Sequence, residues 1–375
     1  MEKINKVLLV TTEYPPGPGG IGSHAFSLSR ALKSKSVNIS VVAITNYVTP
    51  QQADDFDAAH PEAPVAYRLY NSGMFYLLKR ILFVLRLHRR EGFSHIILSG
   101  FFSLWVGALL KLFFRNIYTV AVLHGSEINP ANGLLRFITH QAIASADFIV
   151  PVSEFTHRQL PPKLHSHPFR CIPNGIDPDD LPLANGDSSI LLNGSPTLLT
   201  VGNVTPRKGQ QRIIKALPTL LAEFAQLHYH VVGLPTYRDE FQKLADSLDV
   251  RNAVTFHGRL PNREALANCY TQCDIFMILS ENQKDGDVEG FGIVVLEANY
   301  YGIPVVGARG CGVEAAIDHG FNGLLVDGDN HQEILQAISN IRMDYARYSQ
   351  NAKLWAKRHN WAHISDSFVQ ILAGS

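Results

Sequence analysis

The sequence predicts an α/β protein with two domains, each built around a parallel β-sheet. Short runs of apolar and β-branched residues alternate with helix-length segments along the chain, a pattern typical of parallel strands connected by helices. The alternation is interrupted at residues 172–189, where Pro, Gly, Asn and Asp are frequent, as expected of a linker. The 375 residues are enough for two or three domains that each have a core.

Strand-length runs in the first half define the domain that we expect over residues 1–175. Residues 23–34, between the first two runs, have a helical pattern. Helical connections of this kind place successive strands parallel to one another. The runs cover residues 6–10, 37–45, 95–100, 118–125 and 147–153.

The same pattern restarts after the linker and predicts a second domain over residues 176–357. Ligands of open parallel sheets bind beyond the carboxyl ends of the strands. We therefore expect the two domains to face each other across a cleft that holds the ligand. Residues 358–375 have a helical period, and no strand follows them. The strand-length runs of this half cover residues 197–204, 228–233, 253–258, 274–280, 302–308 and 323–328.

The composition argues against several classes of protein. The chain has 33 basic and 33 acidic residues, so its overall charge does not favour nucleic acid as a partner. None of the four cysteines forms a CxxC pair. We interpret them as small buried residues of a protein in a reducing compartment. The first residues lack the long apolar region of a signal peptide. We therefore expect a cytoplasmic protein.

Two apolar segments of the first half bear on membrane contact. Neither is a run of about 18 apolar residues, so no spanning helix is expected. Residues 101–114 are short and contain Lys111, which favours a buried helix. Residues 74–90 interleave apolar residues with Lys and Arg. They fit either a core helix with a solvated face or a helix at the inner face of a membrane.

A glycine-rich turn follows the first strand. Gly17, Gly19 and Gly22 match the G-x-G-x-x-G pattern of dinucleotide-binding turns. Pro15 and Pro16 separate the pattern from the strand, and the second strand does not end in an acidic residue, which argues against a nicotinamide cofactor. A glycine turn that opens a helix can still offer backbone N–H groups to a phosphate. A plain tight turn is the alternative.

A second turn, in the other half, carries two cations. Arg207 and Lys208 follow a strand and precede a helix, and Gly209 permits close approach of the backbone. Two cations at a helix N-terminus oppose the helix dipole, which suggests an anion between them. Two solvated surface cations are the alternative.

Glu289 and Glu297 lie eight positions apart around Gly290-Phe291-Gly292. The glycine turn opens an apolar helix, whose N-terminus can hold a phosphate. Glu297 lies about 7 Å along that helix, roughly the reach from a diphosphate to its ribose. Glu289 lies on the other side of the phosphate, where a donor sugar would be held. The segment therefore predicts a binding site for sugar, diphosphate and ribose in sequence.

This E-x7-E spacing, with its GFG turn, resembles the family 4 retaining glycosyltransferases of the GT-B fold. The resemblance implies two Rossmann-like α/β domains whose parallel sheets face each other across a cleft, with the last helix crossing back onto the first domain. It covers nearly the whole chain. The similar segments are EYPPGPGG (13–20), LHGSE (123–127), IPNGID (172–177), GNVTPRKG (202–209), FHGRL (256–260), EGFGIVVLEA (289–298) and GLLV (323–326).

The resemblance assigns roles to individual residues. Lys208, with Arg207 beside it, would neutralise the diphosphate of a nucleotide sugar. Glu289 would contact the hydroxyls of the donor sugar, and His124 would line its pocket. Residues implied in nucleotide-sugar binding are Gly19 and Gly20 through their backbone, Asn203, Arg259 and Leu260 beside the base, Gly290, Phe291 and Gly292 along the sugar and phosphates, and Glu297 at the ribose.

The family's activity is transfer of a hexose from a nucleotide-diphosphate sugar to a hydroxyl of a glycan or lipid-linked acceptor. The resemblance implies retention at the anomeric carbon and no metal or other cofactor, so we interpret the DGD motifs at 285–287 and 327–329 as turns rather than metal ligands. Residues 15–21 and 286–298 most resemble the phosphatidylinositol mannosyltransferase-like branch. This favours GDP-mannose over a UDP-hexose as the donor.

One position departs from the family pattern. Where the family commonly has Arg, five residues before Lys208, this chain has Asn203, which brings no charge to the diphosphate; Arg207 or Arg212 could supply it. The departure leaves a catalytically silent nucleotide-sugar-binding protein as an alternative. A relative that hydrolyses or epimerises nucleotide sugars and a nicotinamide-dependent oxidoreductase are the others.

Overall fold

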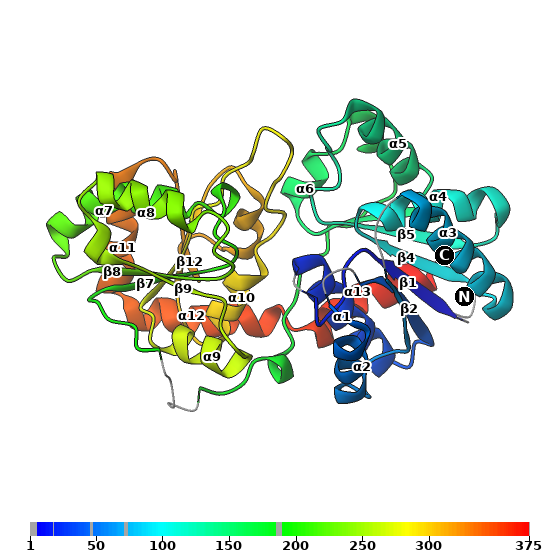
Figure 1. Ribbon diagram of the computed structural model, residues 1–375, viewed down its shortest axis with the longest axis horizontal. Helices are drawn as coiled ribbons and strands as arrows, with labels where there is room; N and C mark the ends of the chain where they lie inside the picture. Colours follow the sequence, from blue (N-terminus) through cyan, green and yellow to red (C-terminus); the bar gives the residue numbers. More distant parts are fainter. Residues whose placement is uncertain (1–5, 18, 46–47, 71–73, 185–189, 375) are drawn as a thin grey trace. The chain divides into compact units, whose positions relative to one another are not determined.

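Two parallel six-stranded sheets organise the chain, each in its own unit (Figure 1). The computed structural model describes residues 6–17, 19–45, 48–70, 74–184 and 190–374. One unit comprises residues 1–175 together with 361–375, and the other comprises residues 176–360. The predicted α/β fold with two parallel sheets is confirmed.

The first sheet has the order β3-β2-β1-β4-β5-β6, in which every pairing is parallel. Its strands are β1 (Val7–Thr11), β2 (Ile39–Ile44), β3 (Ala66–Leu69), β4 (His95–Ser99), β5 (Tyr118–Leu123) and β6 (Phe148–Pro151). The helices of this unit are α1 (Gly20–Ser34), α2 (Pro50–Ala59), α3 (Met74–Glu91), α4 (Phe101–Phe113), α5 (Gly133–Ala144), α6 (Glu154–Arg158) and α13 (Trp361–Ala373).

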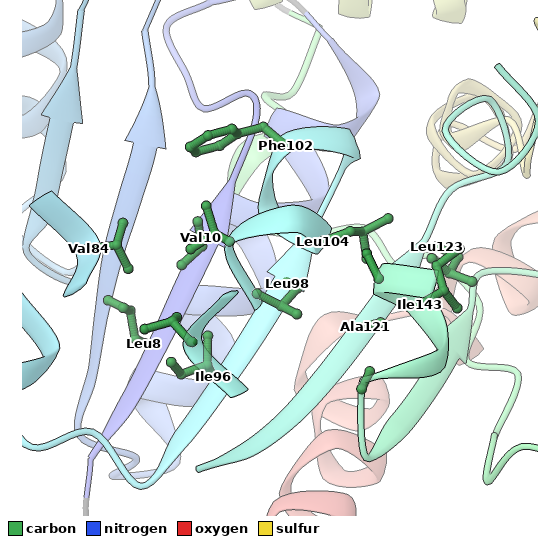
Figure 2. Close-up of a cluster of buried hydrophobic side chains, with 14 of the residues drawn as sticks. Leu8, Val10, Val84, Ile96, Leu98, Phe102, Leu104, Ala121, Leu123 and Ile143 are labelled. Atoms are coloured by element: carbon green, nitrogen blue, oxygen red, sulfur yellow. The ribbon is translucent and has the colours of Figure 1, made fainter. Parts of the chain in front are cut away.

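The central strands are apolar on both faces because helices cover both. Every residue of β1 is buried, as expected of a strand in the middle of a parallel sheet. Leu8 and Val10 of β1 point to the side where α3, α4 and α5 pack, and Val84 and Ile143 come from two of those helices (Figure 2). Helices α1 and α13 pack together on the other side of the sheet (Figure 1).

The last helix belongs to the first unit although it is last in the sequence. Trp361 of α13 packs edge-on against His24 of α1, with ring centroids 5.0 Å apart. Lys35, the C-cap residue just after α1, pairs with Asp366 at 2.6 Å. We expected this terminal segment to begin at residue 358, but α12 continues to Arg358 and the segment begins at Trp361.

The second sheet has the order β12-β11-β10-β7-β8-β9 and is also parallel. Its strands are β7 (Thr197–Val201), β8 (His228–Val232), β9 (Val254–Gly258), β10 (Ile275–Ile278), β11 (Val305–Ala308) and β12 (Gly323–Val326). Its helices are α7 (Gln210–Glu223), α8 (Arg238–Ser247), α9 (Arg263–Thr271), α10 (Ile293–Tyr300), α11 (His331–Met343) and α12 (Tyr345–Arg358). Short 3-10 turns include η3 (Pro206–Lys208) and η5 (Gly312–Ala316).

One strand has no counterpart among the expected ones. Strand β3 has four residues at the edge of the first sheet, and none of them is fully buried. Its sequence, AYRL, lacks the apolar run by which the other strands are predicted. Of the expected linker at 172–189, residues 185–189 lie outside the described residues.

Within the described part of the chain, no helix is both long enough and apolar enough to cross a membrane. The expectation of a cytoplasmic location stays a prediction.

Candidate functional site

The candidate site lies in the second unit, where the connections after β7 and β10 meet. Strands β7 and β10 are neighbours in the sheet. In a parallel sheet the residues that follow neighbouring strands therefore emerge at the same edge. The β7 connection contributes Arg207 and Lys208, and the β10 connection contributes Glu289 and the turn that opens α10.

Gly209 brings the two cations close to the β10 connection. Its φ of 75° is left-handed, a conformation that glycine adopts without strain. A Cβ at this position would lie 1.9 Å from the carbonyl oxygen of Leu279, just after β10. Gly209 is thus required both by its backbone conformation and by close packing. The "RKG" sequence can place its cations here only because the third residue is glycine.

The turn before α10 is held in a similar way. Gly292 caps the helix with a φ of 87°, and Phe291 is buried. The N–H of Gly312 in η5 donates to the carbonyl oxygen of Glu289 at 2.9 Å, and a Cβ at Gly312 would lie 2.2 Å from that oxygen. The predicted helix start is confirmed, and Glu297 is the fifth residue of α10.

One carboxylate holds both cations. The Nζ of Lys208 lies 2.6 Å from Oε2 of Glu289, and Nη1 of Arg207 donates to the same oxygen. Arg207 also lies 3.1 Å from Asp287, measured from Nε to Oδ2. The side chains of Lys208 and Glu289 are only 11% and 12% exposed. The anion that the sequence predicts between the two cations is therefore, in this structure, the carboxylate of Glu289.

The charges of this cluster determine its protonation. Burial works to raise the pKa of Glu289, but the charges of Lys208 and Arg207 outweigh burial and lower the pKa from its ordinary value. Burial likewise opposes the charge on Arg207, yet Glu289 and Asp287 raise the pKa of its guanidinium. Glu289 and Arg207 are therefore both charged at neutral pH. The structure joins Glu289, Lys208 and Arg207 in a direct ion-pair cluster, and their roles toward a ligand stay predictions.

Glu297 is oriented by a tyrosine that the sequence did not reveal. The hydroxyl of Tyr270 in α9 donates to Oε2 of Glu297 at 2.9 Å. Tyr270 is buried and stacks on Tyr301, with ring centroids 5.4 Å apart. Burial, then the charge of Glu297, raises the pKa of Tyr270 well above its ordinary value. Tyr270 thus stays a hydrogen-bond donor and fixes the carboxylate that we predict to bind a ribose.

Asn203, at the position that departs from the family pattern, is exposed. Its backbone carbonyl accepts a hydrogen bond from the side chain of Gln210 at 3.0 Å. Arg212, the other candidate for the missing charge, pairs with Asp329 at 2.7 Å and also donates to the carbonyl oxygens of Leu279 and Ser280. Arg207 is the arginine that lies in the Glu289 cluster.

The two DGD motifs form turns, as predicted. The N–H of Asp287 donates to the side chain of Asp285, and the N–H of Asp329 donates to the side chain of Asp327. Among the described residues, no group of three or more His, Cys, Asp and Glu side chains is arranged to hold a metal ion. The second aspartate of each motif pairs with an arginine, Asp287 with Arg207 and Asp329 with Arg212.

Arg259 and Leu260 follow β9, at the edge of the second sheet. Strand β8 lies between β9 and β7, so these two residues emerge at the same end of the sheet as the cluster but two strands away from it. Arg259 is exposed and Leu260 is partly buried. Their predicted place beside a base stays a prediction.

His124, Gly19 and Gly20 belong to the first unit. The Nε2 of His124 lies 2.9 Å from the hydroxyl oxygen of Ser99, and burial lowers the pKa of His124 to about 4. Its ring packs edge-on against that of His24, with centroids 4.8 Å apart. Gly19 caps α1 and Gly20 begins it. His124 is therefore a neutral imidazole at physiological pH.

Two carboxylates in the first unit were not singled out from the sequence. Glu13 accepts a hydrogen bond from the backbone of Gly22, at the start of α1, and burial raises its pKa. Glu127 accepts from the N–H of His124 at 2.5 Å, and burial raises its pKa to about 7. Both stand in the quoted segments EYPPGPGG and LHGSE. These two segments had been noticed in the sequence, but nothing in the neighbouring residues indicated that the carboxyl groups of Glu13 and Glu127 are buried.

Comparison with protein families identifies both halves of the chain. Residues 18–180 match the model of Glycosyltransferase Family 4, and residues 187–355 match the model of Glycosyl transferases group 1. Together the two matches cover most of the sequence. Among curated proteins, the chain is 28% identical to a GDP-mannose-dependent alpha-(1-6)-phosphatidylinositol monomannoside mannosyltransferase of Mycobacterium tuberculosis, over 92% of this chain and 91% of that protein.

Solved structures share the fold along the whole chain. A sucrose-phosphate synthase of Thermosynechococcus elongatus aligns with a TM-score of 0.79 at 20% identity, covering 99% of this chain and 100% of that one. The Anabaena protein HepE in complex with UDP and glucose aligns with a TM-score of 0.76 at 19% identity and the same coverage. The fold is accordingly GT-B, as the sequence predicts.

The cation cluster makes a prediction for stability. Replacing Glu289 by Gln leaves Arg207 and Lys208 side by side without their shared carboxylate, and we expect this to lower the free energy of unfolding by about 3 kcal/mol. Glu223→Gln, an exposed glutamate at the end of α7, should change it by less than about 0.5 kcal/mol. Urea unfolding of the two variants measures the difference. Equal stability of the two variants would show that Glu289 does not hold the cations.

Proposed function

The chain belongs to the glycosyltransferases, with a Family 4 model matching its first half and a group 1 model its second, and from this membership we propose a specific reaction. The protein moves a hexose from a nucleotide-diphosphate sugar to a hydroxyl of a glycan or lipid-linked acceptor, with retention at the anomeric carbon. The observation that carries this proposal is the cluster in which Glu289 holds Arg207 and Lys208 beside the start of α10.

In the proposed complex the donor takes over the contacts that the cluster makes within the protein. The diphosphate pairs with Lys208 and Arg207, and the N-terminus of α10 supplies backbone N–H groups. Glu289, no longer needed to neutralise the cations, accepts hydrogen bonds from hydroxyls of the sugar. Glu297, oriented by Tyr270, accepts from the ribose hydroxyls. The roles of His124, Gly19 and Gly20 stay predictions.

The proposed chemistry follows from the direction of charge movement. The bond between the anomeric carbon and the phosphate oxygen breaks, and negative charge develops on the leaving diphosphate. Cations already fixed in a largely buried place stabilise that charge without reorganising. The leaving phosphate oxygen takes the proton of the acceptor hydroxyl, which attacks the same face. Arg207 compensates for the uncharged Asn203, and no metal ion is needed.

The identity of the sugar donor is the more specific part of the proposal. The curated relative from Mycobacterium tuberculosis is GDP-mannose-dependent by its name, which supports GDP-mannose at 28% identity over nearly the whole chain. HepE was solved with UDP and glucose, but at 19% identity its likeness concerns the fold alone. We therefore propose GDP-mannose, with a UDP-hexose as the alternative. The neutral hexose is also consistent with Glu289, since its carboxylate would repel a uronic acid.

The first test concerns Lys208. Lys208→Ala should lower the turnover of sugar transfer on the order of 10²–10³-fold, because a charged donor to the leaving group is lost. Lys215→Ala, at an exposed lysine on α7, the helix that follows Lys208, serves as the matched control and should transfer sugar at the parent rate. The assay is run with excess EDTA, in which the parent protein should stay active.

Three outcomes would contradict this mechanism. A Lys208→Ala variant within twofold of the parent would remove the lysine from the transition state. Loss of parent activity in EDTA, restored by Mg²⁺ or Mn²⁺, would show that a metal ion manages the diphosphate. An inactive parent protein that still binds nucleotide sugars would indicate a silent binding protein.

A second test compares the nucleotides directly. GDP should raise the melting temperature at lower concentration than UDP does, because the stabilisation by a ligand grows with its concentration relative to its dissociation constant. Glu297→Gln should weaken protection by both, since the two nucleotides carry the same ribose. Better protection by UDP would overturn the choice of GDP-mannose and leave the glycosyltransferase assignment intact.

A further inference from the structure

Arg68 is an arginine of the edge strand β3 that turns its charge inward. Each residue of β3 is partly buried as a whole, but the side chain of Arg68 is only 5% exposed. Burying a guanidinium is costly unless its N–H groups are paired. Its Nε donates to Oδ2 of Asp57 at 3.1 Å, and its Nη2 donates to the other carboxylate oxygen. Its Nη1 donates to the backbone carbonyl oxygen of Pro15 at 2.6 Å.

Helix α2 supplies the carboxylate that orients Arg68. Among the residues of α2, all of which the structure describes, only Ala53 is buried, so this helix adds little to the core. A carboxylate that accepts two hydrogen bonds from one arginine fixes the plane of the guanidinium. The pair with Asp57 therefore also fixes the direction in which Arg68 donates to Pro15.

The same guanidinium packs against the residue before Pro15. It lies 5.0 Å from the ring centroid of Tyr14, within the range of a cation–π contact. Tyr14 is buried, and its hydroxyl oxygen lies 3.2 Å from that of Ser29 in α1. Arg68 thus holds two consecutive residues, Tyr14 by its ring and Pro15 by its carbonyl oxygen. These two residues lead directly into the glycine-rich turn at 17–22.

The far end of this turn has a second anchor. The carboxyl group of Glu13 accepts a hydrogen bond from the N–H of Gly22, in the first turn of α1. Between the two anchors, Gly19 and Gly20 are exposed. A Cβ built on Gly20 would meet no atom of the described residues within 4 Å. The position of Gly20 therefore depends on how the two ends of the turn are held.

We propose that Arg68 is a positioning residue for the diphosphate of the nucleotide-sugar donor. By holding Tyr14 and Pro15, it keeps the turn at 17–22 in a conformation in which the N–H groups at the start of α1 can bind one anion. A turn that is ordered before the ligand arrives loses less conformational entropy on binding. Arg68 does not bind the phosphate itself, because each of its three nitrogens already donates to the protein.

The role toward a diphosphate rests on the proposed function, whereas the anchoring of the turn does not. Hydrogen exchange measures the anchoring without any ligand. Exchange in the peptide that covers residues 13–22 should be faster in Arg68→Met than in the parent protein. The reason is that the N–H of Gly17, which donates to the carbonyl oxygen of Tyr14, would lose its bond more often once the turn is released.

Isothermal titration calorimetry with GDP and UDP tests the role. Arg68→Met should weaken the binding of both nucleotides about tenfold, the cost of fixing one further backbone residue on binding, because both carry the same diphosphate. Arg68→Lys keeps the charge without the fork of donors and should cause a smaller loss. Arg30→Met is the matched control, because Arg30 of α1 is 11% exposed, pairs with Glu62 and packs on the ring of Phe26. It should leave exchange in the turn and nucleotide affinity unchanged.

The outcomes separate this inference from the proposed function. Parent-like nucleotide affinity in the folded Arg68 variants would overturn it, even if exchange in the turn is faster, since the turn would then be anchored without serving the diphosphate. An equal loss of affinity in Arg30→Met would also overturn it, by assigning the effect to general destabilisation. Neither measurement needs an acceptor or turnover, so a failed transfer assay leaves both intact. A parent protein that binds neither nucleotide would overturn this inference together with the proposed function.

Discussion

The second unit depends on one electrostatic arrangement, in which Glu289 neutralises Arg207 and Lys208. Two cations on a short turn repel each other, and the cost grows when their side chains are mostly buried. The surrounding structure serves to bring a carboxylate to them. Gly209 permits the close approach of the β7 connection, and Gly312 donates to the backbone of Glu289. An anion is required at this place whether or not a ligand is bound.

This requirement explains how the candidate site could be both stable and reactive. A nucleotide diphosphate carries more negative charge than a single carboxylate and can replace it between the cations. On the proposed function, Glu289 then turns from neutralising cations to binding sugar hydroxyls. The cations need not move far, so they are already in place when charge develops on the leaving group. On the proposed function, the same groups that stabilise this part of the unit also bind the donor.

Much of the fold could be predicted because a buried parallel strand appears in the sequence as a continuous run of apolar residues. Strand β3 escaped because it is a four-residue edge strand whose residues are all only partly buried. The two turns of the site could also be predicted, because the glycines that form them, at Gly209 and before α10, stand beside the functional residues in the sequence. The pairing of Arg207 with Glu289 was not local, because it joins residues brought together only by the adjacency of β7 and β10. Residues 101–114 were expected to be a buried helix, and the inner side of α4 is buried, but Leu112 and Phe113 at its C-terminal end are exposed.

The affinity of Glu289→Gln for free GDP tests most directly whether Glu289 competes with a diphosphate for Arg207 and Lys208. Isothermal titration calorimetry of the parent protein and the variant, at a temperature where both are folded, gives the two dissociation constants. GDP has no sugar for Glu289 to bind, so the variant should bind GDP about tenfold more tightly, which corresponds to ~1.4 kcal/mol. Weaker binding of GDP by Glu289→Gln would contradict the account, because it would mean that the carboxylate supports the diphosphate site instead of occupying it.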